Sequence, residues 1–116
     1  MVPDIEIRQL SVWFDTAQGP VKAVDGLSTT FRAGRISGVI GESGSGKSVM
    51  GMSLLRLLPN TARVTGECWF GGQELYSMPL RELRKLRGAA IGLIPQNPNA
   101  SLDPVMKLKK QLTEAI

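Results

Sequence analysis

A glycine-rich stretch at residues 41–48 carries the residue types best suited to chemistry in this chain. It reads Gly-Glu-Ser-Gly-Ser-Gly-Lys-Ser and fits the pattern G-x-x-x-x-G-K-[S/T], a phosphate-binding loop. Glycine lacks a Cβ, so the main chain can turn sharply and leave room for a phosphate. Successive backbone N–H groups can then point inward at the anion. The stretch therefore predicts a phosphate-binding site.

Individual residues of this loop have distinct predicted roles. Lys47 would reach the terminal phosphates of a nucleotide as a point charge, and the Ser48 hydroxyl would ligate Mg²⁺. The positive end of the following helix would reinforce anion binding. The predicted phosphate-binding set is Gly41, Ser43, Gly44, Ser45, Gly46, Lys47, Ser48 and Val49. The alternative interpretation is a glycine-rich turn that happens to contain Lys-Ser.

The segments on either side of the loop favour the phosphate site. Ile36 to Ile40 is a short apolar run, typical of a strand that is buried on both faces. Val49 to Leu58 is apolar nearly all round and stops before Pro59, which predicts a core helix. A strand before the loop and a helix after it are the context that this motif requires.

The opening third of the chain has the pattern of an antiparallel β structure. Apolar residues alternate from Ile5 to Phe14 with a change of phase near Arg8-Gln9, which predicts a strand with a bulge. A turn-forming loop at 15–20 separates it from a second extended stretch, 21–31, which Asp25-Gly26 interrupts.

The later elements are shorter. We expect a tight turn at Gly71-Gly72. Leu80, Leu83 and Leu86 have the spacing of one face of a helix. We expect Ser77 to cap the start of this helix and Gly88 to end it. The predicted elements are a strand over 67–70, a helix over 78–87, a buried strand over 89–94, a polar loop over 97–102 and a helix that begins after Asp103.

Composition restricts the classes of protein. The 116 residues are enough for one small domain, and no apolar run approaches the ~20 residues that span a bilayer. Cys68 is the only cysteine, which excludes a disulfide framework and favours a reduced, cytoplasmic setting. The net charge of +4 does not require a nucleic-acid partner, and we expect none.

Hydrolysis of a nucleotide needs more than the loop. A carboxylate at the end of a neighbouring buried strand has to hold Mg²⁺, and another group has to orient the attacking water. None of the acidic residues after Ser48 follows a run of four apolar residues; they are Glu67, Glu74, Glu82, Asp103 and Glu114. The sequence therefore predicts nucleotide binding without the residues that complete the reaction.

Three stretches together resemble the ATP-binding subunits of ABC transporters, in the branch that imports oligopeptides, dipeptides and nickel. They are A-V-D-G-L-S at 23–28, the loop at 41–48 and P-Q-N-P-N-A-S-L-D-P-V at 95–105. The resemblance covers the whole chain but only the first part of the family's domain. It implies an α/β P-loop NTPase fold, with an antiparallel β subdomain and an incomplete parallel core sheet with helices.

The resemblance assigns further roles by position. Phe14 matches an aromatic residue that stacks on adenine. Its alternation with Val12 also suits a core residue, and the neighbouring Trp13 is the alternative candidate for the stacking role. Ser43 matches a hydroxyl that faces the terminal phosphate. Gln96 matches the glutamine of the family's Q-loop, which ligates Mg²⁺ and senses the γ-phosphate, so Lys47 and Gln96 are the expected catalytic residues.

The resemblance also implies the cofactors, partners and location: ATP and Mg²⁺, transmembrane permease subunits, a second ATP-binding subunit, and the inner face of the cell membrane. The family's signature sequence, strand-end Asp-Glu pair and switch histidine are absent from residues 1–116. We therefore expect a partial nucleotide-binding domain that exposes an apolar sheet edge and self-associates. The alternatives are a nucleotide-binding module without turnover, a nucleotide kinase, or a DNA-repair ATPase.

Overall fold

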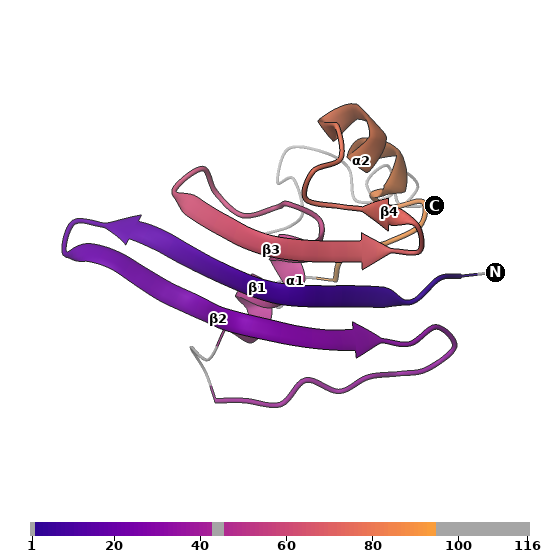
Figure 1. The fold of residues 1–116 in the computed structure, drawn as a ribbon, viewed down its shortest axis with the longest axis horizontal. Helices are drawn as coiled ribbons and strands as arrows, with labels where there is room; N and C mark the ends of the chain where they lie inside the picture. Colours follow the sequence, from indigo (N-terminus) through magenta and orange to yellow (C-terminus); the bar gives the residue numbers. More distant parts are fainter. Residues whose placement is uncertain (1, 43–45, 95–116) are drawn as a thin grey trace, which may run out of the picture.

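The computed structural model describes residues 2–42 and 46–94, and its central element is an antiparallel sheet. The strands lie in the order β2-β1-β3-β4, and each pairs with its neighbour in the antiparallel sense (Figure 1). Their bounds are Ile5–Thr16 for β1, Gly19–Phe31 for β2, Ala62–Phe70 for β3 and Gln73–Glu74 for β4. The prediction of an antiparallel β opening is confirmed.

The predicted break in the first strand is present. Gln9 has a φ of 51°, and the pairing of β1 shifts register between Ile7 and Leu10. Gly66 of β3 lies against this point: its φ is 102°, and a Cβ there would stand 2.4 Å from the Gln9 carbonyl oxygen. Only glycine allows so close an approach, so the bulge in β1 depends on the residue across from it.

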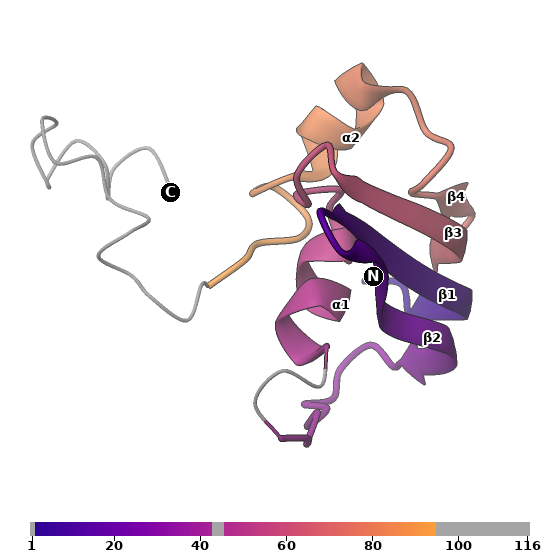
Figure 2. The same cartoon turned by 90° about the vertical axis from the view of Figure 1, so that its left-hand side faces the viewer.

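Two helices accompany the sheet. Helix α1 (Lys47–Leu54) packs on one face of the sheet, and α2 (Leu80–Leu86) lies near β4 (Figure 2). The predicted helix 49–58 has different bounds in the structure: α1 begins earlier, at Lys47, and ends earlier, at Leu54, because the chain turns at Arg56, whose φ is 56°. Neither helix of the described residues has the length and apolar character needed to cross a bilayer.

The predicted N-cap of helix α2 is wrong, and its predicted C-terminal end is confirmed. The N-cap position is Pro79 rather than Ser77, whose backbone N–H instead donates to a carboxylate oxygen of Glu74 at 3.0 Å. Gly88, with a φ of 80°, follows the last turn as expected of a helix terminator. Of the predicted leucine stripe, Leu83 is buried completely, whereas Leu80 stays 44% exposed.

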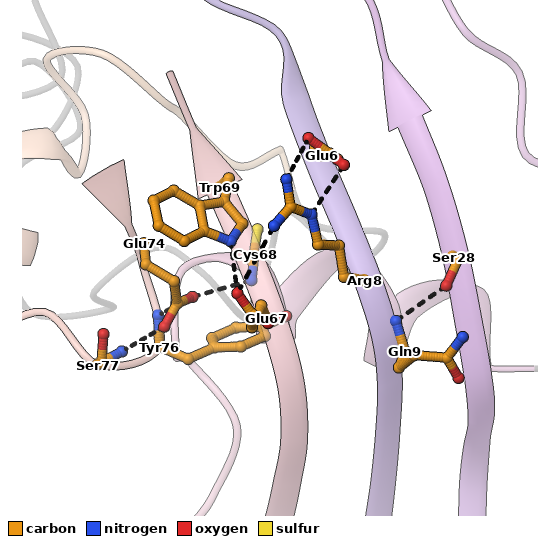
Figure 3. Close-up of polar contacts among 10 residues, drawn as sticks. All are labelled: Glu6, Arg8, Gln9, Ser28, Glu67, Cys68, Trp69, Glu74, Tyr76 and Ser77. Atoms are coloured by element: carbon orange, nitrogen blue, oxygen red, sulfur yellow. Dashed lines mark hydrogen bonds and ion pairs between the residues drawn. The ribbon is translucent and has the colours of Figure 1, made fainter. Parts of the chain in front are cut away.

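The core lies between one face of the sheet and the two helices. Its members are apolar residues from β1, β3 and both helices, together with Leu75 between β4 and α2; they are Ile7, Leu10, Val12, Met50, Cys68, Phe70, Leu75 and Leu83. The opposite face of the sheet carries ion pairs, including Arg8 with Glu6 at 2.8 Å (Figure 3). This one-sided burial is typical of an antiparallel sheet with one solvated face.

The Glu74 carboxylate ties β3 to the chain that leads into α2 (Figure 3). One of its oxygens accepts the backbone N–H groups of Cys68 and Tyr76, both at 2.9 Å, and the other accepts that of Ser77 at 3.0 Å. Burial alone would raise the pKa of Glu74, but these hydrogen bonds outweigh it, and the pKa is lowered. The fold therefore favours the ionised carboxylate.

The strands predicted at 36–40 and 89–94 are wrong for this structure. Residues 36–40 have no regular secondary structure, and Ile36 and Ile40 are fully exposed at 104% and 99%. Of residues 89–94, Ile91 alone takes part in β pairing, through an isolated bridge with Arg87, and Ile94 is 94% exposed. The described residues therefore contain the antiparallel sheet but no parallel core sheet.

The physical reason is that such strands depend on neighbours. A short, continuous apolar run suits a parallel strand only where flanking strands satisfy its N–H and C=O groups and helices cover both faces. Within 2–42 and 46–94, no strand pairs with either segment. The predicted loop at 97–102 and the helix after Asp103 lie outside the described residues.

The Glu74 network predicts a dependence of stability on acid. The unfolded carboxyl titrates near 4.5 and the folded one lower, so its contribution is present above that pH and is lost as the pH falls through the folded pKa. We expect Glu74→Gln to lower the free energy of unfolding at neutral pH and to flatten its decline in acid. Urea denaturation across this pH range measures both effects. Glu82→Gln on α2 is the control, and an equal flattening in that variant would contradict the assignment.

Candidate phosphate-binding site

Gly46 fixes the start of α1 against β2. It occupies the N-cap position with a φ of 96°, and its carbonyl oxygen accepts the first helical hydrogen bond from Met50 N–H at 2.9 Å. A Cβ at this position would lie 2.5 Å from the Ala23 carbonyl oxygen. Both the torsion angle and the contact require glycine, so the last glycine of the loop determines how closely the helix approaches the sheet.

A pocket of about 600 Å³ lies where the loop, α1 and β2 meet. Its walls come from β2, from the segment before the loop and from the first residues of α1. The lining residues are Ala23, Val24, Asp25, Gly26, Leu27, Ser28, Val39, Ile40, Gly41, Gly46, Lys47 and Met50. The structure thus brings the predicted residues Gly41, Gly46 and Lys47 together at one cavity.

Sequence reasoning did not predict the wall that β2 supplies. Residues 23–28 entered only as a stretch of family resemblance, without a role at the site. The available signal was Asp25-Gly26, which interrupts the strand: Gly26 has a φ of 62°, and its N–H donates to the Ser11 hydroxyl at 2.8 Å rather than continuing a regular ladder. The interruption lies in the part of β2 that lines the pocket, where residues 23–28 form one wall.

The Lys47 side chain folds back over its own loop. Its amine donates to the carbonyl oxygens of Gly41 and of Glu42, the latter at 2.8 Å. These acceptors are neutral, whereas phosphate oxygens are charged and form stronger hydrogen bonds with an ammonium group. The lysine is therefore held at the pocket by partners that a phosphate can replace.

The first turn of α1 suits an anion. Within this described helix the first turn contains no acidic residue. The one carboxylate in the described pocket lining, that of Asp25 on β2, pairs with Lys22 at 3.1 Å. Ser48 is exposed there, and its hydroxyl is an oxygen ligand of the kind that Mg²⁺ prefers. Val49 is half-buried and packs against the core, so it anchors the helix.

Phe14 lies apart from this pocket. It is half-buried on β1 between Val21 and Ala62 and packs against the core, and the described lining of the pocket does not include it. Trp13 interacts instead with Lys22, whose amine is 4.8 Å from the ring centroid. The proposed stacking of Phe14 on adenine stays a prediction.

Several predicted site residues lie outside the described part of the chain. They are Ser43, Gly44 and Ser45 of the loop and Gln96. Their roles in contacting phosphate and Mg²⁺ stay predictions.

The contact between Gly46 and β2 predicts opposite effects at two glycines. Gly46→Ala forces an L side chain into a left-handed torsion and against the Ala23 carbonyl, so we expect a loss of at least ~1–2 kcal/mol in the free energy of unfolding. Gly51→Ala, with nothing within 4 Å of the new Cβ, should stabilise α1 by ~0.5–1 kcal/mol. Urea denaturation followed by circular dichroism compares them. Equal stability of the two variants would rule out the close approach.

Comparison with known proteins identifies a family and several similar proteins. Residues 24–115 match the family described as ABC transporter. The oligopeptide transport ATP-binding protein OppD of Salmonella typhimurium is 43% identical over 112 residues, which cover 97% of this chain and 33% of that protein. OppD of Haemophilus influenzae is 42% identical over 116 residues, covering 100% of this chain and 36% of the relative.

A dipeptide transport relative is similar over the same region. The dipeptide transport ATP-binding protein DppD of Lactococcus lactis is 39% identical over 113 residues, which are 97% of this chain and 32% of the relative. The chain spans about a third of the length of these curated relatives. Because the family match covers most of the chain and includes the loop, α1 and the pocket wall from Val24 onward, the chain belongs to the ABC transporter family.

Proposed function

We propose that this chain is the ATP-binding part of an ABC import ATPase that couples ATP binding and hydrolysis to peptide uptake across a membrane. The observation that carries the proposal is the pocket at which Gly41, Gly46 and Lys47 meet at the positive end of α1. Its residue types suit a nucleotide: backbone groups and an amine for phosphates, with apolar walls beside them.

The proposed roles follow the geometry and residue types. Lys47 would exchange its loop carbonyls for the terminal phosphates of ATP, and the glycine-rich backbone would hold the remaining phosphate oxygens. Ser48 and Gln96 would ligate Mg²⁺, which neutralises phosphate charge when bound. Phe14 would stack on the adenine, a contact worth about 1–3 kcal/mol in comparable base–aromatic stacks.

We propose that residues 1–116 form a partial nucleotide-binding domain that binds ATP but does not hydrolyse it alone. The carboxylates of the described residues after Ser48 already have other partners. Glu74 accepts three backbone N–H groups, Glu67 accepts the Trp69 indole N–H at 2.8 Å, and Glu82 pairs with Lys85 at 3.6 Å. To hold Mg²⁺, each of these three would have to exchange those contacts for the ion.

We propose peptides rather than nickel as the class of solute, because the names of the relatives reported above refer to oligopeptide and dipeptide transport. The partners would be transmembrane permease subunits and a second ATP-binding subunit, with the protein on the inner face of the membrane. A nucleotide-binding module without turnover is the second candidate, and the engaged carboxylates described above favour it for residues 1–116 in isolation.

The proposed nucleotide site predicts that removing the Lys47 amine weakens Mg-ATP binding. Lys47→Ala removes charge-assisted hydrogen bonds worth about 1.5–3 kcal/mol, so we expect Mg-ATP affinity to fall about 10- to 100-fold in titration calorimetry. Lys85→Ala, at an exposed residue of α2, is the matched control and should bind as the unaltered chain does. Equal affinity in the Lys47 and Lys85 variants would reject the site. Phosphate release by the unaltered chain above the Lys47→Ala background would reject the absence of turnover.

Exposed apolar residues before the loop predict self-association of the chain. Ile36 and Ile40 are fully exposed, and covering them in a second copy removes apolar surface from water. We expect the unaltered chain to sediment as oligomers at micromolar concentration and the double variant Ile36→Lys/Ile40→Lys to shift toward monomer. Val2→Lys, at a residue 65% exposed, is the control for added charge. A monomeric unaltered chain would contradict the proposal.

A further inference from the structure

The C-terminal end of α1 is held by an arginine from a distant part of the chain. The Arg87 guanidinium donates to the Leu55 carbonyl oxygen through Nε at 3.0 Å and Nη2 at 2.6 Å, and to the Arg56 carbonyl oxygen at 3.1 Å. The last carbonyls of a helix have no partner within the helix and carry partial negative charge. In the described helix the last turn of α1 contains no basic residue, so Arg87 supplies the cation.

A second arginine makes the connection reciprocal. Arg56, just beyond α1, donates through Nη1 to the carbonyl oxygens of Met78 at 2.5 Å and Leu75 at 3.4 Å. Its φ of 56° directs the chain out of the helix axis at this point. We call Arg56 and Arg87 the arginine clamp. The clamp joins the end of α1 to the segment between β4 and α2 and to the end of α2.

The base of the clamp is itself well fixed. The Arg87 backbone N–H donates to the Leu83 carbonyl at 3.1 Å, and Leu83 is completely buried in the core. Beyond it, Gly88 N–H donates to the Ile91 carbonyl at 2.8 Å, which closes a turn. The guanidinium therefore projects toward α1 from an anchored backbone.

Helix α1 needs such support. It has eight residues, too few for a stable isolated helix in water, and its buried residues are Met50 and Ser53. At 1.5 Å per residue it is about 12 Å long, and Gly46 holds its N-terminal end against β2. A tilt of the C-terminal end about that contact therefore changes the direction of the first turn, where Lys47 lines the pocket.

We propose that Arg87 is a positioning residue for the phosphates of the nucleotide. It acts through α1: by holding the Leu55 and Arg56 carbonyls, it sets the direction of the helix and so the place of Lys47 and of the first-turn N–H groups. This inference rests on the proposed function. Arginine suits the role because its planar fork donates two hydrogen bonds to one acceptor, which lysine cannot reproduce.

The test compares Arg87→Met, which keeps an apolar stem without donors, with Arg84→Met at an exposed arginine of the same helix. In the full chain, amide hydrogen exchange reports the local stability of α1, and calorimetry reports Mg-ATP affinity. Loss of hydrogen bonds to a charged group predicts about tenfold faster exchange in α1 and about tenfold weaker Mg-ATP binding in Arg87→Met only. Exchange in β1 should not change, and Arg87→Lys should recover part of both effects.

Each outcome decides the proposal. Exchange in α1 that is equal in the Arg87 and Arg84 variants overturns the clamp. Faster exchange in α1 with unchanged Mg-ATP affinity overturns the positioning role, and acceleration of β1 as large as that of α1 shows a general loss of stability instead. If the unaltered chain binds no Mg-ATP, the proposed function fails, and exchange in α1 still decides the clamp. If Arg87→Met does not fold, Arg87→Lys and Arg56→Met replace it in the same comparison.

Discussion

The contact between Gly46 and the Ala23 carbonyl determines the geometry on which the candidate site depends. Because Gly46 has no Cβ, the first turn of α1 can lie directly against β2. The pocket lies beside this contact. The sheet contains a second close approach of this kind, at the bulge of Gln9 with Gly66 opposite it. Two glycines on different segments thus each permit a close backbone approach, one within the sheet and one between the sheet and α1.

The elements that depend on local chemistry were predictable from the sequence. Alternation from Ile5 to Phe14, its change of phase near Gln9, and the glycine-rich loop each have a local cause: side-chain period, a torsion angle or the absence of a Cβ. The predictions of a bulged strand and of a tight turn are confirmed in β1 and at Gly71, and a helix follows the glycine-rich loop as expected, although it begins at Lys47 rather than Val49. Of the site, the grouping of Gly41, Gly46 and Lys47 followed from the motif alone.

Other features depend on partners distant in the sequence and could not be predicted in this way. The apolar run at 36–40 has the composition of a buried strand, yet it is exposed because no described strand pairs with it. The prediction that Ser77 caps α2 is wrong: the Glu74 carboxylate accepts the Ser77 backbone N–H, and the helix begins after Pro79. Likewise, nothing near Leu55 in the sequence indicates that an arginine 32 residues away completes the end of α1.

The burial of Cys68 has a consequence for following this protein in solution. It is the only cysteine of the chain, it is fully buried on β3, and burial together with the nearby Glu74 carboxylate raises the pKa of its thiol to about 12. Because the thiolate is the reactive form, the folded protein should resist alkylating reagents at neutral pH. Modification of the Cys68 sulfur would then require β3 to leave the sheet. The rate of alkylation therefore reports how often the core opens.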